Sequence, residues 1–135
     1  HLMTEFSGMS HANINDLTRI VIGCVMKVHQ KLGPGLLESA YKECTAYELI
    51  KLGLCIRKEH PVPLIYEKIK LECGYRADLI VENRLLLELK CVDLITDIHR
   101  AQVLTYLKLT GLNLGLLINF NVLHLKEGIR RIILT

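Results

Sequence analysis

The sequence predicts a layered α/β domain in which helices pack on a mixed central β-sheet. Three observations support this class. Two stretches with helical apolar spacing come first, several short β-like segments follow, and a third helical stretch precedes two last strands. Half of the 135 residues are hydrophobic, which suits one globular domain, α/β or α+β in class, over residues 14–135.

The first predicted helix covers residues 17–32, where Asn15-Asp16 offers a cap and apolar residues recur at Ile20, Cys24, Val28 and Leu32. Gly33-Pro34-Gly35 must end that helix. A second helix is expected over residues 36–52, with Gly53 just past its end as a C-cap.

From Leu54 the apolar period changes to that of strands. Short strands are expected at 54–58, 62–66, 69–73, 75–81 and 85–90. Glu67-Lys68 and residues 82–84 supply the turns of two hairpins. A helix over 97–109, ended by Gly111, precedes a buried strand at 114–120 and a last strand at 128–134.

The composition excludes several classes of protein. The longest apolar run, LNLGLLINF from Leu112, falls short of the roughly 20 residues that cross a bilayer, so no membrane association is expected. The opening residues lack the features of a signal peptide, and we interpret 1–13 as a cloning remnant and flexible N-terminus, with a start at Met3 or Met9. Five cysteines without CxxC spacing predict free, mostly buried thiols and a cytoplasmic location. The net charge of +3 permits nucleic-acid binding without arguing for it.

Three charged residues in apolar strands carry the functional prediction. Asp78 lies in one predicted strand, and Glu88-Leu89-Lys90 ends the next, so Glu88 and Lys90 point to one face. The hairpin can bring Asp78 beside Glu88, and a divalent cation such as Mg²⁺ would relieve the repulsion between them. Lys90 could then orient an attacking water. The alternative is a strand-end Asp78 and a surface salt bridge between Glu88 and Lys90, and the residues alone leave both interpretations open.

These residues resemble the D…ExK signature of the PD-(D/E)XK nuclease superfamily. The segment from Gly35 to Tyr41, GLLESAY, fits the GxxExxY pattern of a group of small bacterial proteins in that superfamily. The segment QVLTY, from Gln102 to Tyr106, is similar to the QxxxY motif of its exonuclease-like branch. The resemblance runs from about residue 20 to 131, and it implies a restriction-endonuclease-like core.

The resemblance also implies a role for each residue. Asp78, Glu88 and the backbone carbonyl of Leu89 would ligate Mg²⁺, with Mn²⁺ as a possible substitute. Glu38 would be a further ligand or would hold a metal-bound water. Lys90 would position the attacking water. Gln102 and Tyr106, four residues apart on one helical face, would border the site and touch substrate phosphate or the lysine.

Some of these residues also have purely structural interpretations. Glu38 could favour a helix dipole, and Gln102 and Tyr106 could be ordinary half-buried helix residues. Tyr41 fits core packing better than chemistry. His99 could reach a phosphate from the face of Gln102, although solvated side chains are expected for both His29 and His99.

The resulting functional prediction is a Mg²⁺-dependent nuclease-like domain that hydrolyses DNA and leaves a 5′-phosphate. The alternative is a non-catalytic nucleic-acid or protein-binding module that retains the fold. The chain has no obvious domain for reading bases, so structure- or end-directed cleavage is expected, with a protein partner that delivers the substrate. A homodimer could form through the first helix and the apolar strand near Leu116.

Overall fold

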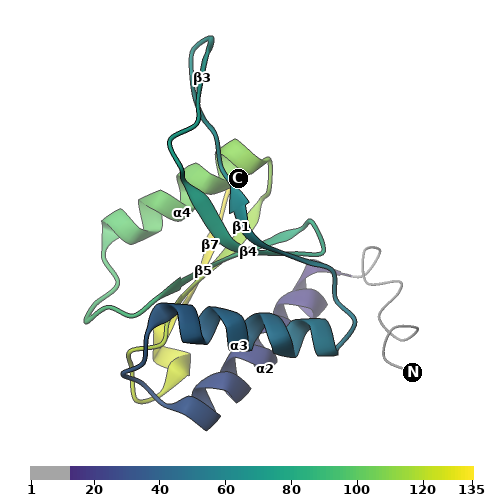
Figure 1. Ribbon diagram of the computed structural model, residues 1–135, viewed down its shortest axis with the longest axis vertical. Helices are drawn as coiled ribbons and strands as arrows, with labels where there is room; N and C mark the ends of the chain where they lie inside the picture. The colour runs from purple at the N-terminus through teal and green to yellow at the C-terminus, as the bar shows by residue number, and fades with distance from the viewer. Residues whose placement is uncertain (1–12) are drawn as a thin grey trace.

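The computed structural model describes residues 13–135 and contains one main sheet covered by helices on both faces (Figure 1). The predicted cloning remnant and flexible N-terminus therefore lie outside the described residues, except for Asn13, which caps a helix. In chain order the elements are α2 (Ile14–Leu32), α3 (Glu38–Lys51), β1 (Ile56–Pro61), β2 (Leu64–Tyr66), β3 (Ile69–Leu71), β4 (Arg76–Val81), β5 (Leu85–Lys90), α4 (Asp97–Thr110), β6 (Leu114–Asn119), the 3₁₀ helix η2 (Leu125–Gly128) and β7 (Ile129–Ile133).

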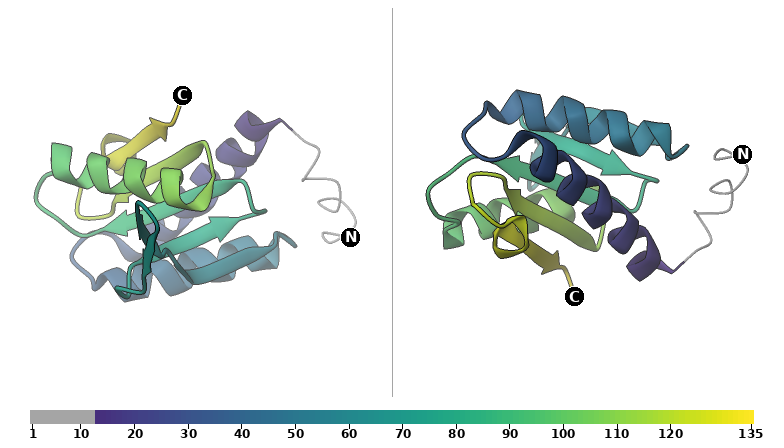
Figure 2. Two further views of the ribbon diagram at one scale, coloured as in Figure 1. Left: turned by 90° about the horizontal axis from the view of Figure 1, so that it is seen from above. Right: turned by 90° about the horizontal axis from the view of Figure 1, so that it is seen from below.

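The main sheet has five strands in the order β1-β4-β5-β6-β7. Strands β5 and β6 are parallel, joined by the crossover helix α4, and the other neighbours are antiparallel. Helices α2 and α3 cover one face and α4 covers the other (Figure 2). The prediction of a mixed sheet flanked by helices, with a restriction-endonuclease-like arrangement, is confirmed.

Strands β2 and β3 form a separate hairpin that projects from the body of the domain (Figure 1). Its turn is at Glu67-Lys68, as predicted, and Glu67 takes a positive φ of 53°. The sequence identified both strands but gave no reason to separate them from the main sheet.

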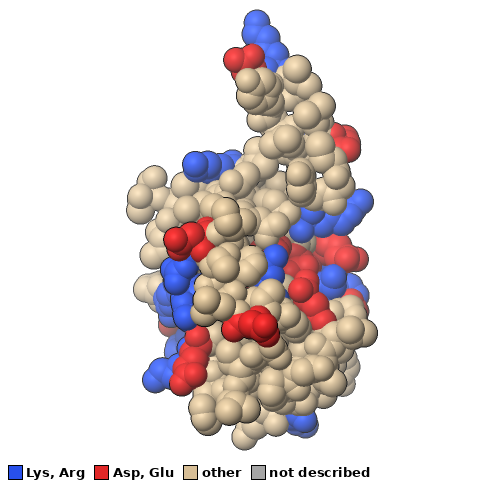
Figure 3. Space-filling model, turned by 90° about the vertical axis from the view of Figure 1, so that its left-hand side faces the viewer, with Lys and Arg blue, Asp and Glu red and all other residues tan. Residues whose placement is uncertain are grey.

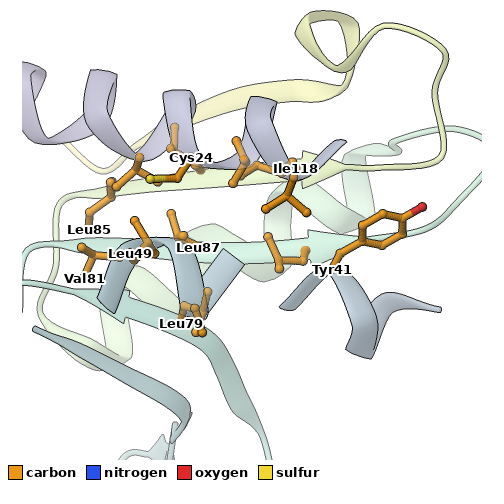
Figure 4. Close-up of a cluster of buried hydrophobic side chains, with 14 of the residues drawn as sticks. Cys24, Tyr41, Leu49, Leu79, Val81, Leu85, Leu87 and Ile118 are labelled. Carbon is orange, nitrogen blue, oxygen red and sulfur yellow. The ribbon is translucent and has the colours of Figure 1, made fainter. Parts of the chain in front are cut away.

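Two hydrophobic cores lie on the two faces of the sheet. The core under α2 and α3 contains Tyr41, Leu49, Leu79, Leu87 and Ile118 among its buried members (Figure 4). The core under α4 contains Ile80, Leu86, Val103, Leu107 and Leu117. Because Leu86 and Leu87 point to opposite cores, β5 is buried on both faces, and a charged side chain in it must find partners within the protein.

The first helix begins earlier than predicted. Asn13, and not Asn15-Asp16, is its N-cap, because the Asn13 side chain accepts a 2.7 Å hydrogen bond from the amide of Asn15. The end of α3 agrees with the prediction, since Gly53 follows its cap residue with a φ of 83°. Two further details differ from expectation: η2 precedes β7, and of the five free cysteines only Cys24 is buried.

Within residues 13–135, no helix combines the length and the apolar character that crossing a membrane requires.

Candidate active site

The three charged residues of the β4–β5 hairpin lie together, and the two carboxylates hold the strands to each other. Glu88 Oε1 accepts a 2.9 Å hydrogen bond from the amide of Asp78, and Asp78 Oδ2 accepts a 2.8 Å bond from the amide of Leu89. The paired positions of the ladder run from Val81–Leu85 to Leu79–Leu87. Beyond that point the two carboxylates provide hydrogen bonds between the strands.

Removal from water raises the pKa of both carboxyl groups. Only 4% of Glu88 is exposed, and burial together with the negative charge of Asp78 raises the pKa of Glu88 to about 8. Burial also raises the pKa of Asp78, while its hydrogen bond from Leu89 opposes that rise. A buried acid pair with raised pKa values is characteristic of sites that bind ions or move protons.

Lys90 connects this acid pair to α4. Its Nζ donates a 3.0 Å hydrogen bond to Gln102 Oε1, and Gln102 Nε2 lies 3.5 Å from the hydroxyl of Tyr106. Burial raises the pKa of Tyr106, and the charge of Glu88 adds to the rise. The structure therefore brings together Glu88, Lys90, Gln102 and Tyr106, and it does not show the surface salt bridge between Glu88 and Lys90 that was the alternative for these residues.

Helix α3 brings Glu38 to the same place through its first turn. Glu38 lies at the exposed start of α3, and partial loss of its hydration raises the pKa of its carboxyl group. The charge of Asp78 adds to this rise, while Lys90 and Lys42 oppose it. These electrostatic effects indicate that Glu38 lies near the acid pair.

Tyr41 explains why the start of α3 is held in place. Its ring stacks on Phe120 with centroids 4.3 Å apart, and its hydroxyl donates to Gly33 O at 2.5 Å and accepts from the amide of Leu36 at 3.1 Å. Those two bonds fasten the loop that leads into Glu38. In GLLESAY the tyrosine thus packs in the core, as expected, and fixes the position from which the glutamate emerges.

Two charged residues at the site were missed by the sequence reasoning. Lys42 Nζ lies 3.0 Å from Glu59 Oε1 and 3.9 Å from Asp78 Oδ1, and its side chain is only 13% exposed. The one available signal was spacing, because Lys42 follows Glu38 by four residues and so shares its helical face. Nothing in the sequence pointed to Glu59, which reaches the site through the pairing of β1 with β4.

The two histidines differ from the expectation of solvated side chains. His29 is buried, and its Nε2 lies 2.8 Å from the carbonyl oxygen of Val122. His99 is half-buried and closes a capping box at the start of α4, where its Nδ1 accepts the amide hydrogen of Thr96. A contact between His99 and substrate stays a prediction, and it would have to use Nε2.

The donor set fits a metal that needs few protein ligands. In the described part of the chain, no group of three or more His, Cys, Asp or Glu side chains is arranged to hold a metal ion. Mg²⁺ is commonly bound through one or two carboxylates with several waters, and half-buried Asp78 and buried Glu88 offer that number. Their mutual repulsion, visible in the raised pKa of Glu88, is what a divalent cation would relieve.

Acidic and basic side chains gather in the middle of one face of the molecule, beneath the projecting hairpin (Figure 3). A pocket of about 200 Å³ between the hairpin and α4 includes Gln102 and Tyr106 in its lining. A larger cavity of about 510 Å³ lies elsewhere, beside the start of α2 and the turn after β4, and contains none of the predicted site residues.

The mixed sheet, its flanking helices and a buried acid pair beside a lysine together define a nuclease-type domain. Among protein-family models, that of the PD-(D/E)XK nuclease superfamily matches residues 15–132. The protein therefore belongs to the PD-(D/E)XK nuclease superfamily, whose nucleases generally use divalent metal ions. Comparisons with curated proteins and with solved structures gave no match.

Proposed function

We propose that this protein is a Mg²⁺-dependent nuclease that hydrolyses DNA phosphodiester bonds with a metal-activated water and leaves a 5′-phosphate. The observation that carries the proposal is a pair of neighbouring carboxylates, buried Glu88 and half-buried Asp78, beside a lysine whose ammonium group is held by Gln102. A buried acid pair of this kind is costly for a purely structural protein.

In this proposal, four groups hold the metal. Asp78 and Glu88 supply carboxylate oxygens, Leu89 its backbone carbonyl, and Glu38 a further carboxylate or a hydrogen bond to a metal-bound water. Glu88 must lose its proton for this, which the raised pKa of its carboxyl group opposes until a cation is present. A bound Mg²⁺ or Mn²⁺ would lower the pKa of a water molecule that it coordinates, and it would neutralise charge on the phosphate.

The remaining residues position the reactants. Lys90 orients the attacking water, and Gln102 fixes the lysine through the 3.0 Å hydrogen bond. Tyr106 and His99 contact the substrate, Tyr106 from the face of α4 that carries Gln102. The superfamily membership supports these roles because the residues occupy the strands and helix on which the resemblance placed them.

We also infer membership of the GxxExxY group of small bacterial proteins, on the basis of Gly35, Glu38 and Tyr41. The structural support is the hydrogen bonding by which Tyr41 fastens the loop before Glu38. Free thiols at all five cysteines are compatible with the proposed cytoplasmic location. Delivery of DNA by a protein partner, and formation of a homodimer, remain parts of this proposal. The strand near Leu116 is the wrong choice for a dimer contact, because Leu116 is fully buried and β6 lies between β5 and β7.

The test is cleavage of end-labelled single-stranded and duplex DNA with Mg²⁺ or Mn²⁺. Asp78→Asn and Lys90→Ala are expected to lower the rate about 100-fold or more. The matched controls are Asp16→Asn and Lys51→Ala, on exposed surfaces of α2 and α3, which should cleave at the wild-type rate. Equal residual activity in all five proteins would indicate a contaminant and count against an enzyme.

A second candidate is a non-catalytic module that binds nucleic acid or protein. It is favoured by the weak overall basicity of the chain, with a net charge of +3, and by its small size of 135 residues. DNA binding that survives both site substitutions, with no cleavage by the wild-type protein, would establish it in place of the nuclease.

A further inference from the structure

The pocket beside the acid site is lined by side chains of the kind that bind a flat aromatic ring. Its volume is about 200 Å³, and its lining consists of Leu64, Tyr75, Gln102, Thr105, Tyr106 and Leu109. The walls are mainly apolar and aromatic. Gln102, at one edge of the pocket, accepts the hydrogen bond from Lys90, so the pocket adjoins the acid site.

The two tyrosines of the pocket contact each other at an angle and not face to face. The rings of Tyr75 and Tyr106 have centroids 6.4 Å apart and are tilted by 57°, so they are not stacked on each other. Tyr106 is buried, whereas 48% of Tyr75 is exposed. The exposed part of Tyr75 is an aromatic surface of the type on which nucleobases stack.

The pocket continues onto one face of the projecting hairpin. The β2–β3 register pairs Leu64 with Leu71 and Tyr66 with Ile69, and because alternate residues share a face, all four point to the side of Leu64. Tyr66, Ile69 and Leu71 are 64%, 54% and 41% exposed. An apolar, partly aromatic strip therefore runs from the pocket along the projecting hairpin.

We propose that this pocket takes an unpaired base of a single strand of DNA, next to the phosphate at the acid site, and that Tyr75 stacks on it. The following bases lie along the hairpin, on Tyr66. This inference rests on the proposed function for its choice of ligand, and continuity with the acid site through Gln102 and Tyr106 favours DNA over a protein partner. A base inside a duplex is stacked on both sides, so only single-stranded or frayed DNA can fill the pocket.

The inference assigns a substrate preference to a residue outside the D…ExK signature. Tyr75→Ala removes the ring but leaves its backbone carbonyl, which accepts a 2.8 Å bond from the amide of Val62, so the strand is kept. Tyr75→Phe keeps the ring. Tyr47→Ala, at a 64% exposed tyrosine on α3, is the matched control for loss of an exposed ring.

Binding is measured in the Asp78→Asn background, which prevents cleavage during the experiment and leaves the pocket lining intact. The probes are fluorescein-labelled oligo(dT) and a blunt duplex of the same length, followed by fluorescence anisotropy. Tyr75→Ala should weaken oligo(dT) binding about tenfold, the effect of losing one stacked base. Duplex binding should change less than twofold, and Tyr75→Phe and Tyr47→Ala should bind oligo(dT) as their parent does.

A spectroscopic readout separates stacking from a merely structural effect. The fluorescence of 2-aminopurine within the oligonucleotide should be quenched on binding, and Tyr75→Ala should abolish the quenching that Tyr75→Phe retains. Undiminished quenching in Tyr75→Ala, or an equal loss of single-strand and duplex binding, would overturn the inference. Conversion of a dimer to a monomer by Tyr75→Ala or Tyr66→Ala, measured by light scattering, would also overturn it, because the strip would then be a contact between two copies.

The proposed function and this inference can fail separately. If wild-type protein cleaves no DNA but oligo(dT) binding depends on Tyr75, the nuclease proposal fails and the base pocket stands. If wild-type protein cleaves single strands and duplexes at equal rates and Tyr75→Ala changes neither rate, the base pocket fails and the nuclease stands.

Discussion

Replacing Glu88 with glutamine should make the metal-free protein more stable at pH 8. Glu88 keeps its proton in the folded protein up to a pKa of about 8, whereas its ordinary value is 4.5. Between these two pH values the folded state binds more protons than the unfolded chain. The free energy of unfolding must therefore fall as the pH rises through this window. Below the window, the ionisation of Glu88 has no effect on it.

The size of the effect follows from the width of the window. Each pH unit within the window lowers the free energy of unfolding by at most about 1.4 kcal/mol. The full interval therefore gives an upper limit on the order of 5 kcal/mol. Solvent screening does little to reduce it, because Glu88 is 4% exposed. Glutamine has no proton to lose, and its side-chain oxygen can still accept the 2.9 Å hydrogen bond from the amide of Asp78. The variant should thus lose the charge and keep the contact.

The assay is urea unfolding in EDTA at pH 5, 6, 7 and 8. Wild type and Glu88→Gln should agree within about 1 kcal/mol at pH 5, and the variant should be more stable by several kcal/mol at pH 8. Glu72→Gln, a change at an exposed glutamate of the hairpin, is the control and should follow wild type. Parallel curves for wild type and Glu88→Gln would refute the assignment of a raised pKa to this carboxyl group.

Four further results are expected. Added Mg²⁺ should stabilise the wild-type protein more at pH 8 than at pH 6, because binding must displace the Glu88 proton, and calorimetry should show no such gain in Asp78→Asn. Lys42→Met should lower the Mg²⁺ concentration for half-maximal cleavage several-fold, since it removes a cation 3.9 Å from Asp78, whereas Lys27→Met, which breaks a pair with Glu48, should not. Tyr41→Phe should cost about 1–3 kcal/mol in urea unfolding, because the amide of Leu36 and the carbonyl of Gly33 lose their partner. Gly115→Ala should destabilise the protein by about 1–3 kcal/mol, because the new methyl group meets the side chain of Val103, which can move. Gly128→Ala should destabilise it more, because its methyl group meets the backbone carbonyl of Asn119.

The hairpin that carries the acid pair could be predicted because its signals are local. Residues 82–84 supply the turn, and Glu82 and Asn83 do take positive φ values of 53° and 54°. The bounds of β5 agree with the prediction at both ends. Counting outward from the turn places Asp78 opposite Glu88, and the hydrogen bonds between their strands confirm that they are neighbours.

Features that depend on packing between distant segments could not be predicted. Lys42 approaches Asp78 only because α3 packs against β4, and Glu59 does so only because β1 pairs with β4. The burial of His29 depends on a carbonyl group 93 residues further along the chain. The projection of the β2–β3 hairpin has the same origin, since its residues have ordinary strand propensity and sequence does not say which sheet they join.

The acid site lies where the regular sheet is interrupted, and this explains how two carboxylates can be buried there. On one side of Asp78, the β1–β4 ladder pairs Lys58 with Leu79 and His60 with Ala77, and Glu59 between them takes a φ of 49°. On the other side, the β4–β5 ladder stops at Leu79–Leu87. There the side-chain oxygen of Glu88 accepts the amide hydrogen of Asp78, and that of Asp78 accepts the amide hydrogen of Leu89. Each carboxylate is therefore both a charge and a structural acceptor. Amide substitutions remove the first property and keep the second, whereas alanine removes both, so only Asn and Gln variants at these positions can separate chemistry from folding.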